Sequence, residues 1–195
     1  MASTDTARWR LKRETDAAHA RLDAALSALD LTDPHDYATF LRVNAAILPS
    51  IERALEAAGI AVLLPDWSER ARRDALLADL DGIGEGSASS AMPVSPPSGA
   101  AEAMGMAYVL EGSRLGGALL ARRAAASGDE RVLANRRFLT HGRPRLWPDF
   151  VVRLDALIDE ANLAEAVAGA NVAFALYADA LAQTRVPLTP AGTAP

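Results

Sequence analysis

Apolar residues recur three and four positions apart through nearly every segment of the chain, and this spacing lines them up along one face of an α-helix. Hydrophobic residues make up 50% of the 195 residues, whereas aromatic residues make up only 5%. The pattern therefore predicts an all-α protein. At this length about two-thirds of the unfolded chain's surface can be buried, so the core needs no disulfide or structural metal.

Helix boundaries follow from capping residues and breaks in the apolar pattern. We expect seven helices, over residues 7–29, 34–58, 68–80, 100–126, 129–141, 148–160 and 162–183. Their expected N-caps include Asp33, Ser68 and Asp129. The expected buried stripe of the last helix is Val167, Asn171, Phe174, Ala178 and Leu181. Residues 1–184 are expected to form one helical domain, with a long Gly/Ser/Pro-rich loop at 81–99 and a disordered tail at 185–195.

Composition excludes several classes of function. The chain has no cysteine, so it has no disulfide scaffold, thiol nucleophile, Cys-ligated metal or axial thiolate. Its apolar stretches are shorter than the ~18 residues of a membrane span, and residues 1–13 lack the apolar region of a secretion signal. A net charge of −5 argues against nucleic-acid binding. We therefore expect a cytoplasmic protein that binds neither membranes nor nucleic acid.

The three histidines do not form a cluster. His19, His35 and His141 fall on three different expected helices, and none has a second ligand at helical spacing, which argues against a multi-histidine metal site. His35 and His141 are expected to be surface or capping residues. A single imidazole on a helix that faces an apolar slot is nevertheless enough to hold haem iron.

His19 belongs to a regular row along the first helix. Lys12, Thr15, His19, Leu22 and Leu26 are spaced three, four, three and four apart, so they share one face. This row predicts that His19 faces inward with the leucines. The spacing alone leaves two interpretations open: a core histidine with a backbone partner, or an axial ligand.

The middle of the expected helix over 100–126 contains three glycines within ten residues. Residues 108–117 read Tyr-Val-Leu-Glu-Gly-Ser-Arg-Leu-Gly-Gly, and each glycine costs a helix about 1 kcal/mol relative to alanine. Gly112 and Gly116 leave a helix surface without Cβ atoms. A flat ligand can approach the backbone there, or a second helix can pack closely, and both interpretations remain open.

Two of these segments resemble haem oxygenases. Residues 11–19, Leu-Lys-Arg-Glu-Thr-Asp-Ala-Ala-His, resemble the segment that opens those proteins, and residues 108–117 resemble their glycine-kinked distal helix. The second segment looks most like the bacterial biliverdin-producing branch that is associated with bacteriophytochromes. The resemblance spans most of the chain, apart from 81–99 and the tail. It implies a helical bundle that holds haem between the N-terminal helix and the glycine-containing helix.

The resemblance also implies roles for individual residues. His19 is expected to be the proximal ligand of the haem iron, Lys12 a partner of a haem propionate, and Gly112 and Gly116 close contacts of the porphyrin. The expected cofactor-binding residues are Lys12, Thr15, His19, Tyr108, Gly112, Gly116 and Gly117, and the expected catalytic residues are Gly112, Ser113 and Gly116.

Two positions depart from the family pattern. Ser113 stands where animal and plant members have an aspartate, which leaves the route of proton delivery open. Arg114 stands where a small residue is usual, and we expect its side chain either in solvent or near the propionates. Arg145 and Arg153 are candidates for a basic propionate partner nearer the C-terminus.

The implied reaction cleaves haem with O₂ and external electrons to biliverdin, CO and ferrous iron. The chain has no nucleotide-binding fingerprint, so a reductase or a ferredoxin is expected to donate the electrons. A bacteriophytochrome is a candidate acceptor of the biliverdin. Two alternatives remain: a haem carrier or sensor of the same fold without turnover, and a helical interaction module without a cofactor.

Overall fold

The computed structural model describes residues 6–84 and 92–185, and within these residues it contains helices and no strand. The helices are α1 (Ala7–Leu26), α2 (Pro34–Ala57), α3 (Ile60–Leu63), α4 (Trp67–Arg70), α5 (Arg73–Gly82), α6 (Ala100–Ala125), α7 (Glu130–Ala134), α8 (Arg137–Thr140), α9 (Leu146–Leu157) and α10 (Leu163–Arg185). The all-α prediction is confirmed. No helix of the described part of the chain is long and apolar enough to cross a membrane.

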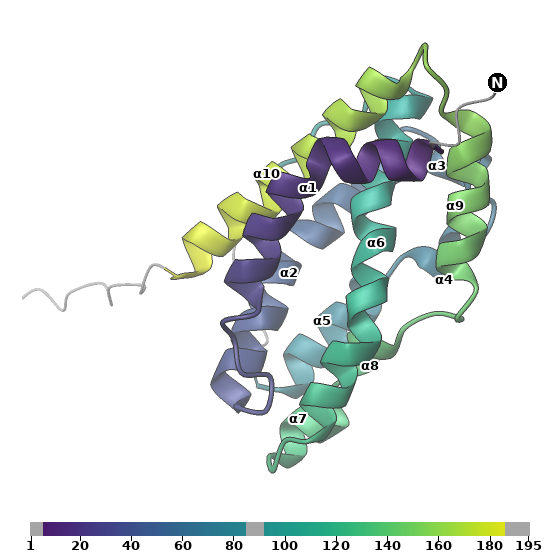
Figure 1. Cartoon of the computed structure of the whole chain (residues 1–195). Coiled ribbons are helices and arrows are strands. Elements are labelled where there is room, and N and C mark those ends of the chain that lie inside the picture. Colours follow the sequence, from purple (N-terminus) through teal and green to yellow (C-terminus); the bar gives the residue numbers. More distant parts are fainter. Residues whose placement is uncertain (1–5, 85–91, 186–195) are drawn as a thin grey trace, which may run out of the picture.

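The C-terminal helix α10 organises the bundle. It packs along α6 and also contacts α1 and α2 (Figure 1). Two glycines bring α10 and α6 close together: a Cβ on Gly105 would overlap the backbone of Ala166, and one on Gly169 would overlap the backbone of Glu102. This crossing is the place where small residues serve helix packing.

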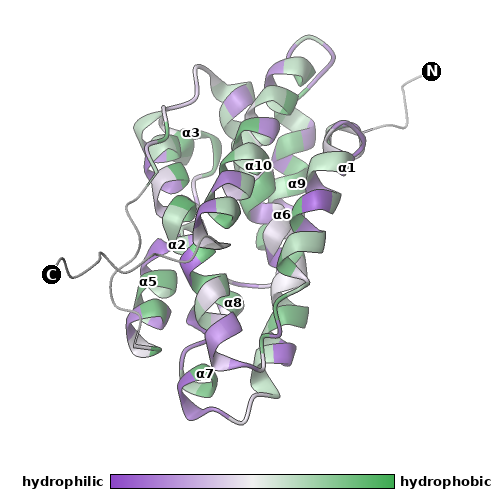
Figure 2. Ribbon diagram, turned by 90° about the vertical axis from the view of Figure 1, so that its left-hand side faces the viewer, coloured by the Kyte–Doolittle hydropathy of each residue, from purple (hydrophilic) through white to green (hydrophobic). Residues whose placement is uncertain are grey.

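Helix α2 supplies much of the core, and its start is as expected. Asp33 caps it by accepting hydrogen bonds from the backbone N–H groups of His35 and Asp36. The buried residues of α2 include the row that the helical spacing predicts, and every member of this row is fully buried: Tyr37, Leu41, Leu48, Ile51 and Leu55. Figure 2 shows the mixture of hydrophilic and hydrophobic residues along the helices that amphipathic packing requires.

The expected helix over 68–80 is wrong at its start. Ser68 lies inside the short helix α4. That helix ends at Arg70, and α5 begins only at Arg73. Glu52 of α2 explains the break, because its carboxylate accepts hydrogen bonds from the backbone N–H groups of Arg72 (2.7 Å) and Arg73 (3.1 Å). The cap of α5 therefore comes from a distant helix. Burial raises the pKa of this carboxyl.

The expected helix over 129–141 is likewise divided, into α7 and α8. Asp129 caps α7 as predicted, by accepting from the N–H of Arg131. The fully buried carboxylate of Asp79 on α5 accepts a 2.7 Å hydrogen bond from the N–H of Phe138, in the first turn of α8. The Tyr37 hydroxyl donates to the carbonyl of Asn135 between the two helices. Long-range polar contacts thus break both helices that the local pattern presents as continuous.

The remaining expectations hold in part. The helix expected over 148–160 is α9, which begins and ends earlier, and α6 agrees closely with the range expected. On α10 the phase of the expected stripe is wrong, because Asn171 and Ala178 are exposed whereas Tyr177 is buried. Of the expected loop, residues 85–91 lie outside the described residues, as do residues 186–195 of the expected tail.

Candidate functional site

The row expected on α1 exists, but its members differ in burial. Thr15 is buried, and its hydroxyl donates to the carbonyl of Leu11 one turn earlier (2.8 Å). Lys12 is exposed, and its ammonium donates to Asp16 at 3.2 Å. The predicted inward burial of His19 is wrong, because 59% of its side chain is exposed.

The imidazole of His19 is oriented by two neighbours. Its Nδ1 lies 3.3 Å from Oδ2 of Asp23, one turn later on α1. Its ring meets the ring of Phe174 on α10 edge to face, with centroids 5.9 Å apart. A carboxylate on Nδ1 favours the tautomer whose Nε2 carries the free lone pair, which is the usual arrangement of a metal-binding histidine. His19 therefore has the donor chemistry of an axial ligand.

Gly112 and Gly116 of α6 do not serve helix packing. A Cβ on Gly116 would meet nothing within 4 Å, and one on Gly112 would reach only the Trp147 ring at 3.8 Å. Gly117 is different, because its Cβ would lie 3.2 Å from the carbonyl oxygen of Leu139 on the buried side. The glycine-packing interpretation thus applies to Gly105 and Gly117, whereas Gly112 and Gly116 border open space.

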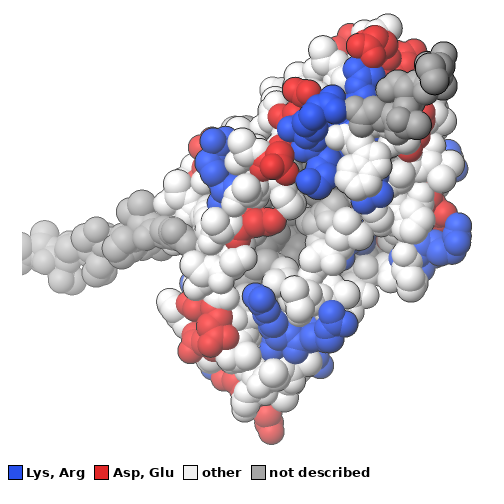
Figure 3. Space-filling model, in the orientation of Figure 1, with Lys and Arg blue, Asp and Glu red and all other residues white. Residues whose placement is uncertain are grey.

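A slot separates α1 from α6. Both helices pack against α10, yet they make few contacts with each other. Figure 3, in the orientation of Figure 1, shows the surface hollowed between them. His19 and Phe174 lie on one side of this arrangement, and the bare backbone at Gly112 and Gly116 lies on the helix opposite. One nitrogen ligand facing a surface without side chains suits a flat ligand that carries a metal, so these residues fit haem.

Aromatic residues close one end of the α6 surface. The Tyr108 and Trp147 rings lie with centroids 6.0 Å apart, and Trp147 also stacks on Phe150 of α9. The Arg8 guanidinium lies over the Trp147 ring, 5.6 Å from its centroid. Burial raises the pKa of Tyr108, so its hydroxyl remains a hydrogen-bond donor at neutral pH.

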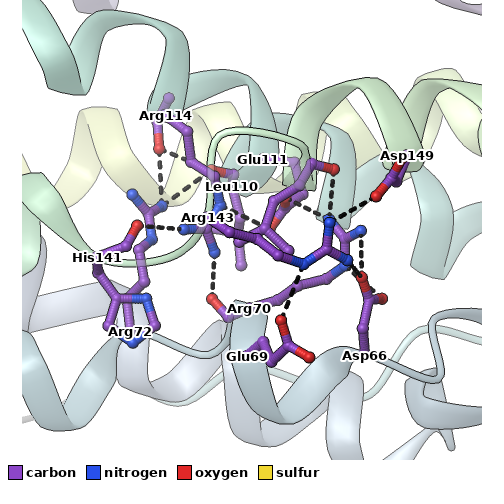
Figure 4. A network of polar contacts seen from close by, with 12 residues as sticks. Asp66, Glu69, Arg70, Arg72, Leu110, Glu111, Arg114, His141, Arg143 and Asp149 are labelled. Carbon is purple, nitrogen blue, oxygen red and sulfur yellow. Dashed lines mark hydrogen bonds and ion pairs between the residues drawn. The ribbon is translucent and has the colours of Figure 1, made fainter.

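Behind the glycine segment, α6 is held by buried ion pairs (Figure 4). The Arg70 guanidinium contacts Glu111 at 2.6 Å and Asp66 at 2.8 Å. Arg114 donates to Glu111 at 3.0 Å and also to the backbone carbonyls of His141 and Arg70. The expectation that Arg114 lies in solvent is therefore wrong, because only 10% of its side chain is exposed, whereas its placement near the propionates stays a prediction. Burial lowers its pKa to about 10.

Arg72 lies beside Ser113, on the flank of the glycine face. Its Nη2 donates to the Ser113 hydroxyl (2.8 Å) and to the carbonyl of Leu110 (2.9 Å), and its guanidinium lies over the Phe138 ring. The Ser113 hydroxyl itself donates to the same Leu110 carbonyl at 2.7 Å. The Ser113 proton is therefore already engaged, and the oxygen is left as an acceptor.

The remaining basic and histidine candidates lie elsewhere. Arg145 and Arg153 line an open groove between α4 and α9, so the structure does not bring them to the slot. His35 is in the first turn of α2, as expected. His141 is not a simple surface residue, because its Nδ1 is buried and has no hydrogen-bond partner among the described residues. Burial and the neighbouring Arg114 lower the pKa of His141.

Known proteins resemble this chain over most of its length. A sequence model of the Heme oxygenase family matches residues 5–183. The chain belongs to the haem oxygenase family. It is 31% identical to the haem oxygenase PigA of Pseudomonas aeruginosa over 180 residues, which cover 90% of this chain and 91% of PigA. It is 32% identical to a haem oxygenase of Xanthomonas campestris pv. campestris over 152 residues, which cover 77% of this chain and 91% of that protein.

A solved structure agrees with these matches. The haem oxygenase of Neisseria meningitidis, determined with bound NO and CO, superposes with a TM-score of 0.72 and 27% identity, covering 92% of each chain. The resemblance to haem oxygenases is thus confirmed, together with the fold and the enzymatic class. The chain is a haem-degrading, biliverdin-producing enzyme, and the interpretation as an interaction module without a cofactor is excluded.

Three features of this haem oxygenase escape the sequence analysis. Arg70 and Arg72 turn inward although charged residues are usually exposed. Tyr177 follows Phe174 by one turn on α10, and it was missed because the expected stripe was out of phase. Gly105 lacks a neighbouring glycine in sequence, and its partner Gly169 is on another helix. Only the last of these carries a local signal, a glycine inside an expected helix.

Proposed function

We propose that this haem oxygenase binds haem in the slot between α1 and α6, where Nε2 of His19 would hold the haem iron. The observation that carries the proposal is the space beside Gly116 and Gly112, because at neither position does close helix packing require a glycine. Bound haem supplies the iron that activates O₂ and is itself the substrate, which is opened to biliverdin with release of CO and ferrous iron.

Each residue that borders the slot has its own role in this proposal. Asp23 holds the His19 ring through Nδ1, and Phe174 limits its rotation. Gly112 and Gly116 allow the α6 backbone to lie directly against the ligand. Lys12, at the rim on the same face as His19, offers a cation to a haem propionate. The roles of Thr15 and Gly117 are structural in this proposal, because both are buried against protein.

The polar flank of α6 shapes the chemistry on the glycine side. The Ser113 oxygen accepts from Arg72, and its remaining lone pair is available to a water molecule in the slot. Arg72, Arg70 and Arg114 place three largely buried positive charges behind this segment, against the buried carboxylate of Glu111. Such an environment favours negative charge that develops in the slot. Arg114 departs from the family pattern, but its side chain does not enter the slot. This departure therefore gives no support to the alternative of a haem carrier without turnover.

Electrons are proposed to come from a separate reductase or ferredoxin, because the sequence has no nucleotide-binding fingerprint. A bacteriophytochrome as acceptor of biliverdin stays a prediction. The deciding experiment is anaerobic reconstitution with ferric haem, followed by a reductant and then air, with visible spectra recorded throughout. We expect a Soret band that gives way to a bilin spectrum. A stable Soret band under these conditions would instead identify a haem carrier.

A further inference from the structure

His141, in the connection between α8 and α9, has one ring nitrogen in the interior and one in solvent. Its Nδ1 is buried and meets no hydrogen-bond partner within residues 6–84 and 92–185. The side chain as a whole is only partly buried, and Nε2 is its solvent-accessible nitrogen. A buried ring nitrogen without a protein partner is normally satisfied by a water molecule. The imidazole therefore spans the boundary between solvent and the interior behind α6.

The segment that carries His141 lies against α6, next to the glycine face. The carbonyl of His141 accepts a 3.2 Å hydrogen bond from Arg114. Successive residues of a helix are about 100° apart, so Ser113 lies between Arg114, which faces this segment, and Gly112, which borders the slot. Ser113 is thus the residue of α6 through which the His141 side of the helix and the slot can communicate.

Arg72 connects His141 with Ser113. Its guanidinium donates to the Ser113 hydroxyl oxygen at 2.8 Å, and its charge also acts on His141. Figure 4 draws the His141 and Arg72 side chains together at one edge of the polar network. The Ser113 proton is directed to the carbonyl of Leu110, so the Ser113 oxygen is an acceptor for donors around it. His141 and Ser113 thus share one charged neighbour.

The charged groups around His141 favour a neutral ring. They are Arg114 and Glu111 of α6 and Arg72, directly before α5. Burial and the two arginines lower the pKa of His141, and Glu111 opposes them. A neutral imidazole can accept a proton at one nitrogen and release one at the other, whereas an arginine stays protonated. His141 therefore has the chemistry to move a proton between solvent and the interior.

We propose that His141 carries protons from solvent to the slot through the back of α6. This inference rests on the proposed function. Ring opening reduces O₂ with external electrons and releases part of its oxygen as water, so protons must reach the slot. Nε2 takes up one proton from solvent, and Nδ1 gives one proton to a water molecule beside Arg72 and Ser113. The ring is neutral before and after this transfer, so no net charge stays in the interior. His141 acts through this water and does not touch haem.

The first test compares the parent with His141→Gln and with the control His35→Gln. Glutamine can hydrogen-bond in place of the ring but cannot relay a proton, and the variant should fold because Nδ1 has no protein partner to lose. Single-turnover bilin formation is followed against pH in H₂O and in D₂O, and haem affinity is measured by titration. We expect His141→Gln to slow bilin formation about tenfold, without a loss of haem affinity.

The dependence on pH separates proton transfer from a structural role. The parent should convert haem faster as the pH falls below about 6.5, where the His141 ring takes up protons, and His141→Gln should lack this rise. It should also show a larger solvent isotope effect than the parent. His35→Gln should match the parent in every measurement. Identical pH profiles and isotope effects for the parent and His141→Gln would overturn the inference.

The second test needs no turnover. The ¹⁵N resonances of the His141 ring in the cyanide-bound ferric complex report its pKa and its tautomer. Ser113→Ala should shift these resonances, because it removes an acceptor of Arg72, whereas Ser98→Ala, before the start of α6, should not. Unchanged His141 resonances in Ser113→Ala would overturn the inference. A parent protein that shows this coupling and a Soret band, but forms no bilin, would refute the proposed function instead.

Discussion

Arg70 Nη1 on α4 donates a 2.6 Å hydrogen bond to Oε2 of Glu111 on α6, the residue that directly precedes Gly112. Both side chains are buried, at 0% and 2% exposed. The same guanidinium also donates to the carbonyl of Leu146, which begins α9. One side chain thus fixes α6 to two other helices beside the glycines that border the slot.

Arg70→Met should destabilise the protein strongly. The change leaves the buried carboxylate of Glu111 with Arg114 alone, and breaking a buried pair typically costs about 3–5 kcal/mol. Urea denaturation of the apo-protein measures the loss. Arg131→Met is the control, because Arg131 pairs with Asp129 in solvent, and it should change the midpoint little. Similar midpoints for the two variants would show that the buried pair does not brace α6.

Replacing a glycine of α6 with alanine should raise the stability of the apo-protein at one position and lower it at another. Gly116→Ala should raise the stability of the apo-protein by up to about 1 kcal/mol, because the new methyl group meets open space and improves helix propensity. Gly105→Ala should lower it by about 1–3 kcal/mol, because the methyl group overlaps the backbone of Ala166. Denaturation curves give both values.

Activity provides the second half of this comparison. Gly116→Ala should still bind haem but lose biliverdin yield, because the methyl group enters the space proposed for the porphyrin. A destabilised Gly116→Ala protein with a normal yield of biliverdin would assign Gly116 to packing.

Replacing His19 should remove the axial ligand. His19→Ala is expected to abolish most turnover and to change the ferric haem spectrum, and added imidazole should restore the spectrum, since the side chain is exposed and its loss leaves an accessible space. Absorption spectra with and without imidazole test this. An unaltered spectrum and rate would remove His19 from the proposed mechanism. His35→Ala is the matched control, because His35 lies in the first turn of α2.

His141 should make stability fall in mild acid. Its pKa is lowered in the folded protein by burial and by the charges of Arg114 and Arg72, opposed by Glu111. The unfolded chain therefore binds more protons just below the ordinary histidine pKa of about 6.5, and stability decreases as the pH falls through that range. Between about pH 7.5 and about pH 5.5, the parent should lose more stability than His141→Gln in paired denaturation curves. Parallel losses in the two proteins would contradict this assignment.

Local sequence signals predicted the long helices well. Asp33 and the buried face from Tyr37 to Leu55 on α2 follow from capping and spacing alone, because neighbouring residues determine them. The breaks between α4 and α5 and between α7 and α8 could not be predicted in this way. Their caps, Glu52 and Asp79, are 20 and 59 residues away, and only the tertiary fold brings them close.

The candidate site shows the same difference between local features, which the sequence predicts, and tertiary contacts, which it does not. The row that contains His19 and the segment that contains Gly112 and Gly116 are visible in sequence, because each lies within one helix. Their environment is not visible there. The exposure of His19 depends on the separation of α1 from α6, and the inward turn of Arg114 depends on Arg70 and Glu111.

The separation of α1 from α6 also links the stability of the fold to the binding of haem. Because the two helices meet through α10, a ligand in the slot supplies cohesion that the empty bundle lacks. A ligand that binds only the native state stabilises it by about 2.7 kcal/mol when its free concentration is one hundred times its Kd. Haem is consumed, however, because each catalytic cycle converts the rigid macrocycle into open-chain biliverdin. Because bound haem stabilises the native state, we expect proteases to cleave the apo-protein faster than the haem-bound protein.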